Sequence, residues 1–149
     1  MRLTIKTGEK VKTQIGGLLI EVLNREVGDD FGMSVEVYPE DDPSNQLLRF
    51  DCFHDDPHYH VPPSAPGQLN IDKEKYGDGL DWAIEQIRNN VVSLVDRAGF
   101  PEISQKLNQN DFRRDWQKIK MACESAPEPS VEKTVELTEE QLKQIRGEE

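Results

Sequence analysis

The sequence predicts a single α+β domain, in which an antiparallel sheet of four to five strands (residues 2–61) is followed by two to three helices packed on one face. Three observations support this prediction. Short segments before residue 61 alternate apolar and polar residues, which is the period of a strand. Between residues 78 and 98 apolar residues recur every three or four positions, which is the period of a helix. The length of 149 residues suits one domain.

Four segments before residue 61 have the character of strands. Leu3 and Ile5 alternate with polar neighbours, and residues 33–38 alternate along their whole length. Residues 46–54 continue the sheet after a turn rich in Asp, Pro, Ser and Asn, and residues 58–61 resume it after Pro57.

The segment 13–27 fits either a strand or a helix. Its apolar spacing matches a helical stripe, but Gly16 and Gly17 are adjacent within it. Two glycines would cost a helix about 2 kcal/mol relative to alanine. We therefore favour a strand from Gly17 to Arg25, and the helix stays the alternative.

The helical part begins at Asp78, a good N-cap with Asp81 three residues later. Its apolar face continues to Ala98, where Gly99 and Pro101 predict the end of the helix. Pro101 then opens a short helix to residue 107. A third helix is predicted from residue 110, with an apolar face made of Phe112, Trp116, Ile119 and Cys123.

The composition changes at Ala126, where Ala-Pro-Glu-Pro-Ser is typical of a linker. We predict a domain over residues 1–125 and an acidic, partly disordered C-terminal tail over residues 126–149. Thr138-Glu139-Glu140-Gln141 has the form of a capping box and predicts a short helix over 139–146. Alternatively, the segment is an arm that docks on the domain or on a second copy.

The charge restricts the class of partner. The chain has 29 acidic and 18 basic residues, a formal net charge of −11, which argues against nucleic acid or an anionic membrane. A protein partner or a homo-dimer fits this balance better. No apolar segment approaches the roughly 18 residues of a spanning helix, so we expect a cytoplasmic protein whose two cysteines stay reduced.

All three histidines lie within seven residues, at His54, His58 and His60. On one strand, His58 and His60 point the same way, with side-chain origins roughly 6–7 Å apart. They could converge on a divalent metal such as zinc, with His54, Asp55 or Asp56 as a further ligand or as the base. Such a site would activate a water for hydrolysis. A structural hydrogen-bond network, or an acid–base or ligand-binding role without metal, is the alternative.

Further pocket candidates surround the histidines. With a period of two, Cys52 and His54 belong to the core-facing set of residues 46–54. Burial would raise the pKa of the Cys52 thiol and make it a poor nucleophile. The remaining pocket candidates are Asp51, Tyr59 and Trp82.

The run from Leu48 to His60 contains F-D-C-F-x-x-x-P-H-Y-H and resembles the signature of an uncharacterised bacterial domain family. The similarity extends into residues 82–99, and it implies no known activity. A fainter resemblance, to small toxin-like proteins of toxin–antitoxin loci, rests on Phe50, Asp51, Pro57, His58 and His60. The acidic tail and the few basic residues depart from that pattern and argue against an RNA-directed role.

Three functions follow as hypotheses. The first is a small interaction or regulatory module whose acidic surface or tail meets a protein partner. The second is a metal-dependent hydrolase that uses His54, His58 and His60. The third is a component of a toxin–antitoxin pair. The interaction module ranks first because no complete catalytic set is visible.

Overall fold

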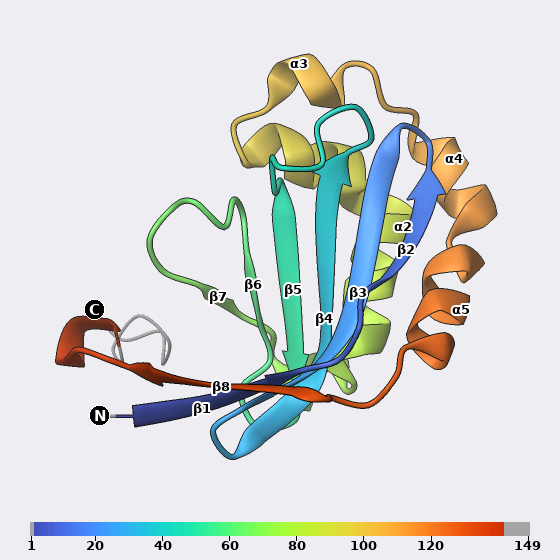
Figure 1. Ribbon diagram of the computed structural model, residues 1–149. Coiled ribbons are helices and arrows are strands. Elements are labelled where there is room, and N and C mark those ends of the chain that lie inside the picture. The colour runs from blue at the N-terminus through green and yellow to red at the C-terminus, as the bar shows by residue number, and fades with distance from the viewer. Residues whose placement is uncertain (1, 142–149) are drawn as a thin grey trace.

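A computed structural model describes residues 2–141. It shows an eight-stranded sheet with helices packed on one of its faces (Figure 1). The order across the sheet is β7-β6-β5-β4-β3-β1-β8, with β2 also paired to β3, and neighbouring strands are antiparallel. The strands are β1 (Arg2–Thr7), β2 (Val11–Ile15), β3 (Leu18–Val27), β4 (Asp30–Pro39), β5 (Leu48–Phe53), β6 (His58–His60), β7 (Leu69–Asn70) and β8 (Val131–Glu136).

The α+β class is confirmed, but the sheet is larger than the predicted four to five strands. Residues 13–27 form strand and not helix, as we favoured. They belong to two strands, however, because β2 ends at Ile15 and β3 begins at Leu18. Gly16 and Gly17 make the turn between them, with φ of 55° and 90°, a backbone region that glycine enters without steric cost. The same glycines that argued against a helix therefore add one strand to the sheet.

Strand β3 shares one of its sides between two partners. Its first half, Leu18–Val22, pairs with β2, and its last residues, Arg25–Val27, pair with β1. Strand β1 then pairs along its full length with β8. We call β1 and β8 together the terminal ribbon, which crosses the lower front of the sheet in Figure 1.

The helices confirm the sequence prediction in outline. They are α1 (Lys73–Tyr76), α2 (Gly79–Arg97), α3 (Pro101–Ser104), α4 (Gln109–Asp115) and α5 (Gln117–Ser125). The Asp78 side chain caps α2 by accepting from the Leu80 amide at 2.8 Å. The third predicted helix is divided into α4 and α5 at Trp116, which lies between them.

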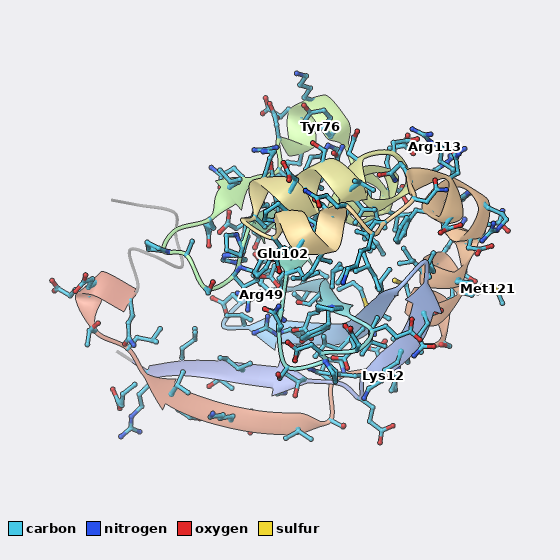
Figure 2. All side chains as sticks on the ribbon, turned by 90° about the horizontal axis from the view of Figure 1, so that it is seen from above. Lys12, Arg49, Tyr76, Glu102, Arg113 and Met121 are labelled. Atoms are coloured by element: carbon cyan, nitrogen blue, oxygen red, sulfur yellow. The ribbon has the colours of Figure 1, made fainter. Side chains whose placement is uncertain are left out.

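The core lies between the sheet and the helices, so the sheet has a helix face and an open face. Side chains of the helix face include Ile20, Val35 and Phe50, which pack against Ile87 and Val91 of α2. The strand period of two sends Arg49 and Asp51 of β5 to the open face. Figure 2 shows Arg49 between the helix layer and the terminal ribbon.

Part of the segment predicted to be an acidic, partly disordered tail pairs with the sheet, since β8 lies beyond Ala126. The chain that leads into β8 is held by Asn24 of β3, whose side-chain Nδ2 donates to the carbonyl oxygens of Ala126 and Pro127, both at 3.1 Å. The helix predicted over 139–146 lies largely outside the described residues. Among residues 2–141, no helix is both long enough and apolar enough to cross a membrane.

Candidate functional site

Two strand pairs on the open face build the candidate site. In the antiparallel β5–β6 register, Asp51 is opposite His58 and Arg49 is opposite His60. Side chains directly opposite each other share a face of the sheet. Ser34 of β4 is opposite Asp51 on its other side. The sheet register therefore gathers a carboxylate, two imidazoles and a guanidinium on one patch.

Asp51 is the centre of this patch and is only 2% exposed. Its Oδ1 accepts from Ser34 Oγ at 2.7 Å and from Arg25 Nη1 at 3.3 Å. Its Oδ2 lies 3.0 Å from His58 Nε2 and accepts from Arg49 Nε at 3.1 Å. Burial alone would raise the pKa of Asp51, but the hydrogen bond and charge of His58 and the charge of Arg49 hold it well below the usual value. Asp51 is therefore an ionised carboxylate saturated with donors.

The His58 ring is held between two acceptors. Its Nδ1 is 2.8 Å from the carbonyl oxygen of Asp56, and its Nε2 faces the Asp51 carboxylate. Both nitrogens must donate in this geometry, which makes the ring an imidazolium. Burial lowers the pKa of His58, but the hydrogen bond and charge of Asp51 outweigh it and raise the pKa above 6.5.

The His60 ring differs from His58 at Nε2, which accepts a hydrogen bond and does not donate one. Its Nδ1 lies 3.2 Å from the carbonyl oxygen of Gly67 and donates to it. Its Nε2 lies 3.1 Å from Arg49 Nη2, which can only donate, so Nε2 accepts. Each imidazole nitrogen of both rings is thus engaged, and neither ring has a nitrogen free to act as a general base on a ligand.

These side chains form the floor of a pocket of about 300 Å³. This volume is at the lower end of the range for small-molecule sites. The polar lining comprises Arg25, Arg49, Asp51, His58, His60, Gly67 and Gln68, and the apolar lining comprises Leu3, Ile5, Val27, Phe53, Pro63, Ala65 and Pro66. Among the residues that the structure describes, Asp51 is the single acidic one that lines it, against two guanidiniums and one imidazolium. The pocket is therefore electropositive on a protein of net charge −11.

The same residues also have features of a metal site. Among the described residues, Asp51, His58 and His60 each offer one ligand atom, and these atoms lie within 4.8 Å of one another. Both histidines direct Nδ1 at a backbone carbonyl, which is how proteins orient a ring that binds metal through Nε2. However, Arg49 donates to Asp51 Oδ2 and His60 Nε2 and so bridges two of the three ligand atoms. A metal ion would have to displace this guanidinium and the proton of His58.

The structure does not bring His54 into this group. His54 follows the end of β5, and its exposed ring stacks on Phe31 with centroids 5.3 Å apart. Its Nδ1 lies 3.0 Å from Asp55 Oδ1, and Asp55 is exposed as well. Asp56 contributes through its carbonyl oxygen, which orients His58. The turn at Pro57 interrupts the alternation of side chains between β5 and β6. No sequence pattern therefore indicated whether His54 lies on the same face of the sheet as His58 and His60.

Three other pocket candidates lie on the helix face. Tyr59 stacks on Phe50 at 5.8 Å and approaches Trp82 at 5.1 Å, so both pack with the core. Burial raises the pKa of Cys52 well above the usual value, as the strand alternation predicted. Arg25, Arg49 and Ser34 were not among the predicted site residues. Alternation could have found Arg49, two residues before Asp51, but nothing in the sequence indicated Arg25.

Comparison with known proteins adds a family and no activity. No curated protein and no solved structure matches the chain. The profile of one family, described as a domain of unknown function (DUF7700), matches residues 12–123. This match spans β2 to α5 and includes the Asp51–His58–His60 patch, while β1 and β8 lie outside it. The chain therefore belongs to the DUF7700 family of uncharacterised domains.

Proposed function

We propose that the open-face pocket binds a small organic anion. The observation that carries the proposal is the pairing of Arg25 and Arg49 at the floor of one pocket, where Asp51 is the single acidic lining residue within residues 2–141. Guanidinium groups are suited to carboxylates because they offer several donors in a fixed plane.

Donor capacity remains available on both arginines. Asp51 and His60 engage Arg49 through Nε and Nη2, and Asp51 and Ser34 engage Arg25 through Nη1. Within residues 2–141, Arg25 Nη2 and Arg49 Nη1 form no hydrogen bond. The side chains are 20% and 29% exposed, so a ligand in the pocket can reach them. Asp51 acts as a positioning residue that fixes the two guanidiniums.

Titration calorimetry with hexanoate and with neutral hexanamide tests this proposal. Hexanoate binds and hexanamide does not, and Arg49→Gln weakens hexanoate binding by about ten- to a hundredfold, the value of one to two charge-assisted hydrogen bonds. Arg113→Gln is the matched control, because Arg113 lies on α4, away from the pocket lining. Equal binding of acid and amide, or no binding by folded protein at millimolar ligand, contradicts the proposal.

A divalent metal such as zinc, held by Asp51, His58 and His60, is the second candidate. The two Nδ1–carbonyl contacts favour it. When bound, the ion would supply the Lewis acid of a hydrolase. Elemental analysis of the purified protein and zinc titration test it, with His58→Ala as the ligand variant and His54→Ala as its control.

Arg49→Ala separates the two candidates in one variant. Under the anion proposal the variant loses affinity for hexanoate. Under the metal proposal it gains affinity for zinc, because the competing guanidinium is removed from Asp51 Oδ2 and His60 Nε2. The sign of the change in each titration decides between them.

The partner-based functions stay predictions. The net charge of −11 supports a regulatory module with a protein partner, and the resemblance of residues 48–60 supports a toxin–antitoxin component. Co-expression with the product of a neighbouring small gene tests the latter: toxicity that one of the two relieves supports it, and its absence argues against it.

A further inference from the structure

The pocket has a chemically divided lining that the anion proposal uses only in part. One side carries Arg25, Arg49 and the two histidines. The other side is apolar, and its sheet residues are Leu3, Ile5 and Val27. An inorganic anion would leave this second side against water, whereas a ligand with a hydrocarbon part would cover it.

We propose that the pocket is selective for carboxylates that carry a short hydrocarbon tail, and that the terminal ribbon supplies the wall that recognises the tail. This inference rests on the proposed function and names the class of ligand. The head of the ligand lies on Arg25 and Arg49, and the tail lies on Leu3 and Ile5.

The strand register places the contacts for the carboxylate head and for the hydrocarbon tail one after the other along β1 and β3. Arg25 and Val27 are two residues apart on β3 and thus share a face. In the β1–β3 pairing, Ile5 is opposite Val27 and Thr7 is opposite Arg25. The apolar wall therefore begins one pleat beyond the Arg25 guanidinium, along the same two strands.

The terminal ribbon turns its apolar side inward. In β1 the exposed residues Arg2, Thr4 and Lys6 alternate with half-buried Leu3 and Ile5. The pairing of β1 with β3 ends at Ile5, and beyond it the Gly28 amide donates to the Thr4 carbonyl oxygen at 2.9 Å. On its other side, Leu3 is opposite Val135 of β8. Both strands of the ribbon thus contribute to the wall, one directly and one by support.

The β1 part of the wall lies outside the segment that matches the family, whereas Val27 of β3 lies inside it. The family match covers residues 12–123, which includes both arginines and both histidines but neither Leu3 nor Ile5. The cationic floor therefore lies within the matched segment, and the terminal ribbon adds Leu3 and Ile5 to the wall from outside that segment. We assign anion recognition to the first and tail selectivity to the second.

Calorimetry with propionate, butyrate, pentanoate and hexanoate measures the tail directly. Burial of one methylene is expected to tighten binding roughly fourfold. In the wild-type protein, affinity rises along the series and levels off when the tail fills the cavity of about 300 Å³.

Ile5→Thr removes apolar surface from the wall and keeps a β-branched strand residue. It leaves propionate affinity within about twofold and flattens the rise toward hexanoate. Lys6→Thr, on the exposed side of β1, is the matched control and retains the rise. Val27→Thr repeats the test from β3 if the ribbon variant fails to fold.

Each other outcome overturns a defined part. Carboxylate binding that is independent of tail length overturns this inference and leaves the proposed function standing. A rise that persists in both Ile5→Thr and Val27→Thr overturns the assignment of the wall. No carboxylate binding overturns both proposals. Acetyl-Gly-Leu is the comparison with a peptide that ends in a carboxylate. If it binds more tightly than hexanoate, the ligand is the carboxyl end of a peptide, and the assignment to a free acid is overturned.

Discussion

Asp51→Asn is the substitution that most directly tests how the site is held together. The variant keeps the shape of the side chain but removes the charge that faces Arg25, Arg49 and His58. Breaking a buried ion pair by removing one partner costs about 3–5 kcal/mol. Both guanidiniums remain partly exposed, at 20% and 29%, and can regain hydration. We therefore expect a loss of about 2–4 kcal/mol in the free energy of unfolding.

The dependence of this loss on pH has a defined sign. The pKa of Asp51 is below its usual 3.8, so the stability from its contacts is present above about pH 4 and is lost as the pH falls through the folded-state pKa. The pKa of His58 is raised above 6.5, so its contribution is present below pH 6.5 and is lost as the pH rises through the folded-state pKa. The difference between wild type and variant is thus largest between about pH 4 and 6.5.

Urea denaturation of both proteins from pH 3 to pH 9 measures this profile. Toward the acid end the difference shrinks, because protonated Asp51 resembles asparagine. At the alkaline end it falls only partly, because Arg25 and Arg49 stay charged. Asp55→Asn is the control, since the exposed Asp55 contacts only exposed groups, and it changes stability by less than about 0.5 kcal/mol. A difference below about 1 kcal/mol at pH 5.5, or one that is constant with pH, would refute the reasoning.

Two further predictions concern the turn at β2–β3 and the buried thiols. Gly16→Ala and Gly99→Ala both place a side chain at positive φ. At Gly16 the new Cβ would lie 3.0 Å from Asp111 Cβ, whereas at Gly99 it would meet no described heavy atom within 4 Å. Gly16→Ala therefore lowers the thermal midpoint further, and equal shifts would contradict this. Burial raises the pKa of Cys123 to about 12, so at pH 8 only about one thiol in ten thousand is ionised, and Cys123 reacts with a thiol reagent only after unfolding. Prompt reaction of Cys123 in native Cys52→Ala protein would show that the thiol is not buried as described.

The elements that could be predicted from sequence are those with a local cause. The Asp78 cap, the α2 stripe and its end at Gly99 each depend on residues within a few positions of one another, and all three were correct. The strand alternation of residues 46–54 correctly separated Phe50 from Asp51. Pairing between distant segments has no such local signal. Strand β8 joins the sheet through partners more than 120 residues away, so the sheet was underestimated.

The candidate site divides in the same way. His58 and His60 were correctly placed side by side, because they are two residues apart on one strand. His54 is close to them in sequence, which suggested that it belongs to the same site. It lies one residue beyond the end of β5, however, and its ring stacks on Phe31 instead. Arg25 reaches Asp51 across β4, through a register that no motif encodes. Sequence reasoning therefore found the imidazoles and missed the guanidiniums that decide the charge of the pocket.

That charge makes the anion and metal functions alternatives and not additions. A dication and the Arg49 guanidinium compete for the same two atoms, Asp51 Oδ2 and His60 Nε2. With Arg49 in place, the site has already satisfied its carboxylate with cations, and a further positive charge meets repulsion from Arg25 and His58. An anion meets attraction from the same groups and has free donors on both arginines. The arrangement of the side chains therefore favours an anion in the pocket, and zinc binding requires that Arg49 first leave it.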